Sequence, residues 1–330
     1  MKLSKFSLLF NYQYLSILID YAILSHLCIE KTPHINWRFL RLIINHFKEP
    51  IMTTLHIVLS DLDVTHAIFS KISLLQNKFS ANVIWYLHHP PRFFDRRYFS
   101  NELATISGNL QASHQNKVDQ IELKINQHCP KSKVHICKEK YWSKQVDNEA
   151  NTLDPIVIIR SKSGLTSADN QYVNNNQHTV FILNQEKWLS DGKAIGAIDP
   201  FHEDDSDNKS DRKVYLFMRQ WCTPAEQSEP FLLHVIHIPP LAIEYEKKIE
   251  AVHKEQIYRF AKQVKCAKNL LTFVRGTPEH ALLTYVDDNK IDLIVLGCRK
   301  HSLFDKWLNG STISVLISHQ NSDMVLINTP

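Results

Sequence analysis

Short apolar runs alternate with amphipathic segments from about residue 52 to the end of the chain. Continuous apolar runs are typical of strands buried between two helical layers, whereas apolar residues spaced three and four apart are typical of helices that cover a sheet. The pattern up to residue 183 predicts strands at residues 56–60, 82–88, 134–137, 155–159 and 179–183, and helices at residues 64–79, 100–127 and 142–152. The polar stretch 161–176 is expected to be a connection.

The same alternation starts again after a polar connector at residues 184–191. Strands are predicted at residues 193–198, 231–237, 270–274, 291–296 and 324–327. Helices are predicted at residues 214–221, 241–264, 279–287 and 311–318, and residues 202–211 are expected to form an acidic, solvated loop. Strands that alternate with helices favour parallel sheets joined by right-handed crossovers.

The two rounds contain similar segments in the same order. An aspartate follows the first strand of each (Asp61 and Asp199), and the segments 87–91 and 236–240 both end in Pro-Pro. The apolar runs at 155–159 and 293–296 correspond, as do those at 179–183 and 324–327. Four matches in one order predict a unit of about 135 residues that is used twice.

Residues 1–51 do not fit this repeat. Asn11, Gln13 and Asp20 interrupt their apolar residues, so no run approaches the roughly 18 apolar residues of a membrane helix. A membrane anchor or signal peptide is the less favoured interpretation. Lys48-Glu49 can be encoded by a ribosome-binding sequence just before Met52, and we therefore expect residues 1–51 to be a non-native or disordered extension. Translation from Met1 stays open.

Composition narrows the choice of function. A length of 330 residues with 44% hydrophobic residues allows two ordinary domains. The formal charge of +4 is small and no basic stripe is present, which argues against nucleic acid as a partner. The 6 cysteines form no C-x-x-C pair, so reduced thiols and a cytoplasmic location are expected. The histidine pairs do not share a strand face, and no metal site is expected.

The segment 291–312 combines a strand, Gly297, a basic loop and Gly310-Ser311-Thr312 before a predicted helix. Glycine allows close approach of a backbone, and unpaired N–H groups at a helix N-terminus attract anions. This arrangement is compatible with a phosphate cradle. An ordinary crossover that leads into a capped helix explains the same residues.

The spacing of Gly297, Lys300, Gly310 and Ser311 resembles the signature of the universal stress protein family, with Lys300 where the second motif glycine is expected. Asp199 and the segments 276–282 and 292–297 extend the resemblance. Over Met52–Pro330 the order of elements is similar to tandem, E-type members. The resemblance implies two tandem flavodoxin-like (adenine nucleotide alpha hydrolase-like) five-stranded parallel sheets that form an internal pseudo-dimer through their last strands. It implies a degenerate domain at 52–188 and a second domain at 189–330.

The resemblance also implies an ATP site in the second domain only, because the first domain has Arg160 at the position that Gly297 holds in the second domain. Asp199 would face the ribose, and Val235 and Ile236 the adenine. The remaining expected contacts are to the phosphates: Gly297, Gly310, Ser311 and Thr312 through backbone or hydroxyl groups, and Arg299, Lys300 and Lys306 through charge. The Lys300 side chain either blocks the backbone or pairs with phosphate.

The family implies a cytoplasmic stress-response protein without catalytic residues, which acts by binding and dimerisation. A homodimer and weak ATP hydrolysis stay open. One alternative is a nucleotide hydrolase of related fold, for which His301 and Asp305 are the nearby candidates. Another is a module that binds an amphipathic ligand, for which the aromatic residues after the second strand are candidates: Trp85, Tyr86, Phe93, Phe94 and Tyr98.

Overall fold

The computed structural model describes residues 53–60, 62, 64–88, 101–130, 132–137, 142–149, 155–160, 164–175, 178–185, 187–189, 192–200, 209–222, 231–299, 316 and 322–329. Met52–Pro330 forms one compact unit by its internal contacts. The expectation of an extension at residues 1–51 lies outside the described residues, as does the predicted helix at 311–318 except for its residue 316.

The described strands and helices follow the predicted alternation. The strands are β1 (Thr54–Leu59), β2 (Asn82–His88), β3 (Lys133–Cys137), β4 (Ile156–Arg160), β5 (Thr179–Leu183), β6 (Ala194–Ala197), β7 (Leu232–Ile236), β8 (Leu271–Arg275), β9 (Leu293–Arg299) and β10 (Asp323–Thr329). The α-helices are α3 (His66–Phe79), α4 (Asn101–His128), α5 (Ser143–Glu149), α6 (Ser167–Asn175), α7 (Lys209–Trp221), α8 (Glu246–Gln263) and α9 (Pro278–Asp288). Two short 3-10 helices are η3 (Pro240–Tyr245) and η4 (Lys268–Leu270).

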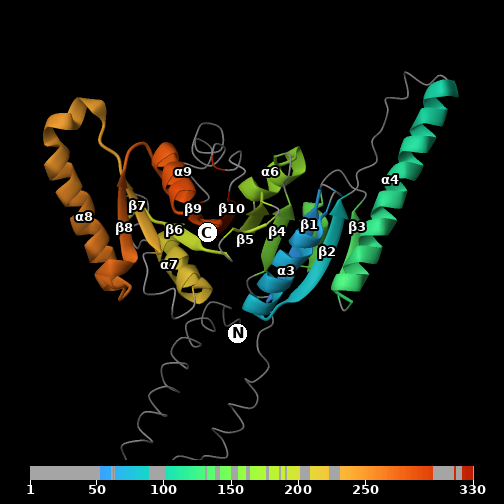
Figure 1. The fold of residues 1–330 in the computed structure, drawn as a ribbon, viewed down its shortest axis with the longest axis horizontal. Helices are drawn as coiled ribbons and strands as arrows, with labels where there is room; N and C mark the ends of the chain where they lie inside the picture. Colours follow the sequence, from blue (N-terminus) through green and yellow to red (C-terminus); the bar gives the residue numbers. More distant parts are fainter. Residues whose placement is uncertain are drawn as a thin grey trace, which may run out of the picture. The chain divides into compact units, whose positions relative to one another are not determined.

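All ten described strands belong to one sheet, in the order β3-β2-β1-β4-β5-β10-β9-β6-β7-β8 (Figure 1). Within β1–β5 and within β6–β10 every pairing is parallel, and the strand order is the same in both sets when each is read from its third strand. We call β1–β5 with their helices the first half and β6–β10 with theirs the second half. The predicted five-stranded parallel unit is therefore present twice.

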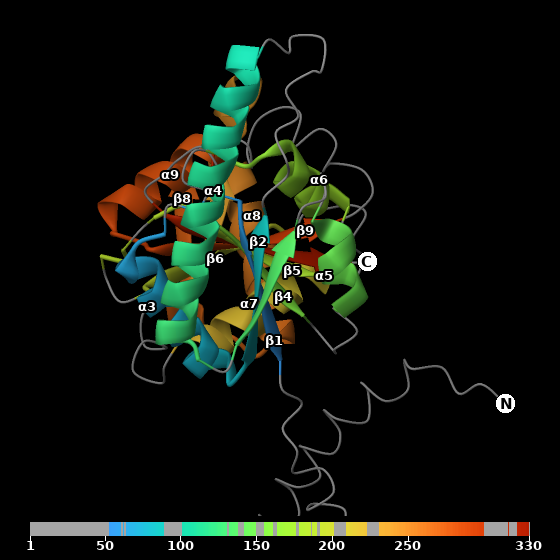
Figure 2. The same cartoon turned by 90° about the vertical axis from the view of Figure 1, so that its right-hand side faces the viewer.

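Helices cover both faces of the sheet, which explains why its central strands are apolar on both sides. One core cluster lies between the sheet and α3, α4, α7 and α8, with Ile72, Ile125, Met218 and Phe260 among its members. The other lies between the sheet and α5, α6 and α9 and includes Val146, Val173 and Leu282. Figure 2 shows this for the first half, where α3 and α4 lie on one side of the strands and α5 and α6 on the other.

The two halves join edge to edge through antiparallel pairing of β5 with β10. Phe181 pairs with Val325, and the pairs Ile182–Met324 and Val180–Leu326 flank it. The expectation of two separate sheets needs correction, because this pairing merges them into one mixed sheet. The merger removes the exposed edges of β5 and β10, whose backbone groups would otherwise lack partners. The last strands form the contact between the halves, as the resemblance implies.

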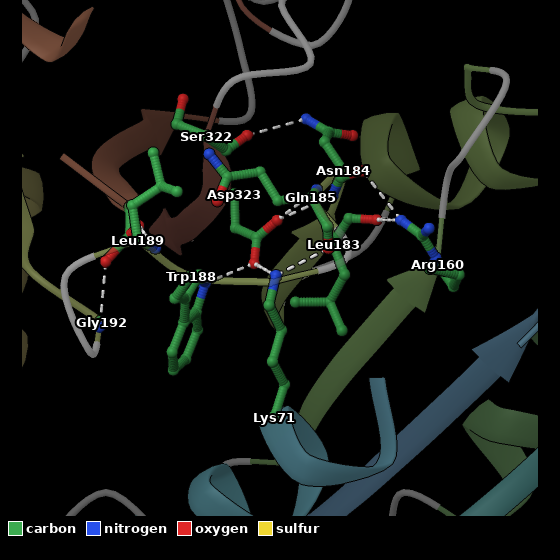
Figure 3. Close-up of polar contacts among 11 residues, drawn as sticks. Lys71, Arg160, Leu183, Asn184, Gln185, Trp188, Leu189, Gly192, Ser322 and Asp323 are labelled. Carbon is green, nitrogen blue, oxygen red and sulfur yellow. Dashed lines mark hydrogen bonds and ion pairs between the residues drawn. The ribbon is translucent and has the colours of Figure 1, made fainter. Parts of the chain in front are cut away.

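A buried ion pair ties α3 to the start of β10. The Lys71 Nζ lies 2.7 Å from Asp323 Oδ2, and both side chains are buried. Asp323 also accepts hydrogen bonds from the backbone N–H groups of Asn184 and Gln185 and from the indole of Trp188 (Figure 3). Burial raises the pKa of Asp323 and lowers the pKa of Lys71, and each group opposes the shift of the other. Neither charge is therefore tolerated well without its partner.

A second buried carboxylate holds the connector between the halves. Asp292 precedes β9 and accepts hydrogen bonds from the backbone N–H groups of Leu189 and Gly192, at 2.6 and 3.0 Å. The indole of Trp221 donates to the carbonyl of Gly192. The polar connector is thus bound across the amino ends of β9 and β10 by side chains of the second half.

The structure differs from the sequence prediction in two places that bear on the site. Helix α6 lies within the polar stretch 161–176, where no helix was expected because apolar residues are few. Its apolar residues Ala168, Tyr172 and Val173 are all buried, and their burial stabilises the helix. Helix α7 begins at Lys209, so that Asp211 lies in its first turn and is buried. Residues 209–211 of the predicted acidic loop are therefore helical, and its residues 202–208 lie outside the described residues.

Candidate functional site at the carboxyl edge of the second half

Strands β6 and β9 form the point at which the chain order of the second half reverses. From β6 the chain proceeds outward to β7 and β8, and it then returns to β9 and β10 on the other side of β6. In open parallel sheets, ligands bind beyond the carboxyl ends of the strands at such a switch point. Ala197 pairs with Leu296, so the residues that follow, Ile198-Asp199 and Gly297, meet at this position.

The peptide group between Ile198 and Asp199 is held at both of its ends. Its carbonyl oxygen lies 3.0 Å from Nδ1 of His234 on β7. Its N–H donates to Oδ1 of Asp211 on α7, at 3.1 Å. His234 and Asp211 are buried, with 2% and 6% of their surfaces exposed, whereas the Asp199 side chain is exposed. A buried polar frame thus presents one exposed carboxylate at the switch point.

A second imidazole extends this frame to α8. Nε2 of His234 lies 2.7 Å from Nδ1 of His253. Burial lowers the pKa of His234 and of His253, while the nearby Asp199 carboxylate raises both. Burial raises the pKa of Asp211 to about 7, against the opposing effect of the hydrogen bond from the Asp199 N–H. Near neutral pH the two histidines are therefore neutral, and Asp211 titrates.

Gly297 serves the contact between β9 and α7. A Cβ atom at this position would lie 2.9 Å from Cβ of Ser210, closer than side chains tolerate. The missing side chain therefore lets the first turn of α7 approach β9. Strand β9 continues through Gly297 to Arg299, so the glycine lies within the strand and not after it.

The structure brings several of the predicted site residues to this edge. Val235 and Ile236 lie at the carboxyl end of β7, next to Ile198-Asp199, but the Ile236 side chain is buried in the core. Arg299 ends β9. The other predicted phosphate contacts lie outside the described residues: Lys300, Lys306, Gly310, Ser311 and Thr312. The hydrolase candidates His301 and Asp305 lie outside them too.

At the corresponding edge of the first half, the carboxylate of Asp169 on α6 is buried. Its oxygens accept hydrogen bonds from the Ser60 hydroxyl after β1, the Trp142 indole and the N–H and hydroxyl groups of Thr166, at distances of 2.7–2.9 Å. Trp142 packs on Tyr172 of α6, with ring centroids 4.5 Å apart. The chain's own side chains therefore occupy the space beyond β1 in this half.

Strand register identifies the equivalent residues of the two edges. Leu55 and its partner Ile156 face the same core cluster as Ala194 and its partner Leu293, so we take these two pairs as equivalent. This alignment places Ser60 at the position of Asp199 and Arg160 at that of Gly297. The sequence match of Asp61 with Asp199 is thus wrong by one residue. Arg160 is buried, and its guanidinium donates to the carbonyl groups of Leu183 and Asn184. Its side chain stabilises the end of β5.

Sequence reasoning missed the polar residues that build these two edges. Asp211 looks like part of an acidic loop, and Asp169 lies in a polar stretch. A signal was present for His234, which is a single imidazole within the otherwise apolar run 231–236. A polar residue inside a buried strand requires partners, and His234 contacts the carbonyl of Ile198 and the ring of His253.

Three findings bear on other classes of site. Among the described residues, no group of three or more histidine, cysteine, aspartate or glutamate side chains is arranged to hold a metal ion. No helix in the described part of the chain has the length and hydrophobicity needed to cross a bilayer. The five cysteines in that part (Cys129, Cys137, Cys222, Cys266 and Cys298) are buried, and none of them forms a disulfide bond.

Comparison with known proteins agrees with the architecture. Residues 218–328 match the universal stress protein family. No curated protein sequence matches the chain significantly. Among solved structures, a Pseudomonas aeruginosa UCBPP-PA14 protein assigned to the universal stress proteins superposes with a TM-score of 0.60 and 11% identity, over 84% of this chain and 93% of that one. A functionally unknown protein of Pseudomonas aeruginosa PAO1 superposes with a TM-score of 0.58 and 12% identity, over 84% and 92% of the two chains. Both similarities show a shared fold.

Proposed function

Because residues 218–328 form a universal stress protein domain, we propose that this chain is a stress-response protein whose second half binds ATP. It acts by binding and dimerisation and not by catalysis, in the cytoplasm. The first half contributes a scaffold and no second nucleotide site. The family generally lacks enzymatic activity, and the described residues at the carboxyl edge include no metal-binding carboxylate cluster of the kind that phosphate hydrolysis usually requires.

The contrast between the two carboxyl edges carries the proposal. At the switch point of the second half, an exposed aspartate stands on an immobilised peptide beside a glycine. A carboxylate in this position suits the hydroxyl groups of a ribose. At the equivalent point of the first half, a serine already donates to Asp169, and a buried arginine replaces the glycine.

The remaining predicted contacts complete the proposed site. Val235 is partly exposed at the end of β7 and supports an adenine ring, whereas buried Ile236 offers only its backbone. Gly297 and Arg299 lie on β9, from which the chain continues to Lys300, Gly310, Ser311 and Thr312. In this proposal these residues receive the phosphates, with the ammonium of Lys300 replacing the backbone contact of a motif glycine by an ion pair.

Equilibrium dialysis of the full chain against labelled ATP tests the proposal. We expect saturable binding that Gly310→Val and Asp199→Ala weaken by roughly tenfold or more, the equivalent of losing one charged hydrogen bond. Ser60→Ala is the matched control in the first half and should leave the affinity unchanged. Absence of ATP binding to the unmodified chain, or binding that is indifferent to Gly310→Val and Asp199→Ala, would refute the proposal.

A further inference from the structure

We infer that Asp211, His234 and His253 are positioning residues of the nucleotide site, because together they fix the peptide that carries Asp199. This inference rests on the proposed function and extends it to three residues that do not themselves meet the ligand. They come from three elements: Asp211 from α7, His234 from β7 and His253 from α8. Their hydrogen bonds run in series across the carboxyl end of β6.

The two hydrogen bonds to the backbone act on one planar unit. The carbonyl of Ile198 and the N–H of Asp199 belong to the same peptide group, which cannot twist about its C–N bond. His234 holds the oxygen and Asp211 holds the N–H. A peptide that is held at both ends cannot rotate about its flanking bonds without breaking one of them. The Cα of Asp199, directly after this unit, is therefore fixed.

The chain of contacts also determines the tautomers of both histidines. A carbonyl oxygen only accepts, so Nδ1 of His234 must carry the proton that it donates to Ile198. In neutral His234, Nε2 then has a lone pair, and it accepts from Nδ1–H of His253. Both rings therefore carry their proton on Nδ1. His253 selects the tautomer of His234 that can hold the peptide.

The other charged groups around His234 do not hold the 198–199 peptide. Asp199 follows β6, Arg275 on the neighbouring β8 pairs with Glu246 and Glu250, and Lys254 pairs with Glu250. The hydrogen bonds of Arg275 and Lys254 go to Glu246 and Glu250 on α8 and not to the 198–199 peptide. We call Asp211, His234 and His253 the clamp: Asp211 and His234 contact the peptide directly, and His253 contacts His234.

The first half lacks this clamp. Register aligns the pair Ile57–Trp85 with Gly196–Leu232, which places Leu87 at the position of His234. Leucine has no donor for the carbonyl of Leu59. Two copies of one sheet thus differ at a buried position, and the copy with the imidazole is the one with the exposed carboxylate. The clamp therefore accompanies the exposed carboxylate and is not required by the fold, which both halves share.

Nitrogen-15 NMR of the full chain with labelled histidine tests the tautomers directly at pH 7.5. We expect Nδ1 of His234 and Nδ1 of His253 to be protonated and both Nε2 atoms to be of the unprotonated type, with His234→Asn and His253→Phe used for assignment. His253→Phe should release His234 into a mixture of tautomers. A His234 ring that is protonated at Nε2 in the unmodified chain would overturn the inference.

ATP affinity tests the positioning role. His234→Leu copies the residue of the first half and removes the donor, whereas His234→Asn keeps an N–H donor close to the place of Nδ1. We expect His234→Leu and Asp211→Leu to weaken ATP binding roughly tenfold and to speed hydrogen exchange at the Asp199 amide. His234→Asn and Asp211→Asn should stay within about threefold of the unmodified chain. His280→Leu, on the exposed side of α9, is the control.

The outcomes separate the two proposals. If the chain binds no ATP, the proposed function fails, while the tautomers and the exchange of the Asp199 amide still decide whether the clamp exists. If ATP binds and the leucine and asparagine variants have equal affinity, the clamp does not position the ligand. A folded His234→Leu protein with unchanged affinity and unchanged exchange would also refute it.

Discussion

The two halves of the sheet repeat the same strand order but differ at their carboxyl edges. In the first half, Asp169 accepts hydrogen bonds from Ser60, Trp142 and Thr166, and so closes the edge with the protein's own groups. In the second half, Asp199 is exposed and the clamp holds its peptide. The shared topology supplies the switch point, and side chains decide whether it remains available to a ligand.

The difference has a physical consequence for how each half uses buried polar groups. A buried carboxylate is costly unless donors surround it, and the first half meets this cost with four donors to Asp169. In the second half, the buried polar groups instead hold one peptide group, and the carboxylate of Asp199 is exposed.

The largest expected effect concerns the ion pair between the halves. Lys71→Met leaves Asp323 buried without its cation and should lower the free energy of unfolding by about 3–5 kcal/mol. Lys213 on α7 is the matched lysine of the second half, and it is exposed and donates to the carbonyl of Asn328. Lys213→Met should cost at most about 1 kcal/mol. Urea unfolding of the full chain measures both, and equal losses would show that the junction does not depend on the buried pair.

Two buried groups, His56 in the first half and Asp211 in the second, should contribute pH slopes of opposite sign. Burial lowers the pKa of His56 to about 4, so the unfolded chain binds its proton first and stability falls as pH drops below the ordinary value of 6.5. The pKa of Asp211 is raised to about 7, so stability falls as pH rises from 3.8 toward 7. Each effect reaches on the order of 3 kcal/mol.

Variants separate these two slopes between pH 4 and pH 6.5. His56→Gln should reduce the loss of stability at acidic pH and make the free energy of unfolding decline more steeply with rising pH. Asp211→Asn should do the reverse. Denaturant midpoints taken across this range give the slopes relative to the unmodified chain. Parallel curves for all three proteins would contradict the assignment of both buried groups.

Removal of the Asp169 carboxylate should destabilise the first half without changing the affinity of the chain for ATP. Asp169→Ala leaves the Trp142 indole and the Thr166 N–H without their acceptor. We expect this to lower the free energy of unfolding by about 2–3 kcal/mol. ATP affinity should not change, because the proposed ATP site lies in the second half. Asp288→Ala, at the exposed end of α9, is the control for loss of a carboxylate. A weakened ATP affinity in Asp169→Ala would break the contrast between the edges.

The smallest expected effect concerns Gly297. A methyl group there would meet Cβ of Ser210 at 2.9 Å, so Gly297→Ala should displace the first turn of α7 and cost about 1–2 kcal/mol. Since Asp211 lies in that turn, ATP affinity should fall along with stability. The double variant Gly297→Ala with Ser210→Gly relieves the contact and should restore both. If the double variant regained stability but not affinity, Gly297 would contact the ligand itself.

Local patterns were sufficient to predict the fold but not the polar groups that distinguish its halves. Apolar runs gave the ten strands, since burial on both faces leaves a continuous signal in the sequence. Lys71 and Asp323 are 252 residues apart in the sequence, so no local pattern could predict that they form an ion pair. A hint existed in the helix, where Lys71 lies within the apolar stripe of Ile68, Ile72 and Leu75.

For the candidate site, local patterns singled out individual residues but not the groups that surround them. Asp199 and Gly297 were found because they follow or end apolar runs, and strand order then brings them together. The clamp was not found, because it depends on which side chains of α7, β7 and α8 converge on one peptide. Register also moved the first-half equivalent of Asp199 from Asp61 to Ser60, a shift of one residue that changes the face on which a side chain points.

Native mass spectrometry of the full chain with ATP tests the central contrast most directly, because it counts ligands per molecule. The account predicts one ATP per chain, retained in Ser60→Ala and lost or strongly reduced in Asp199→Ala. Two ATP molecules per chain, or a single one that disappears with Ser60→Ala and persists with Asp199→Ala, would contradict it.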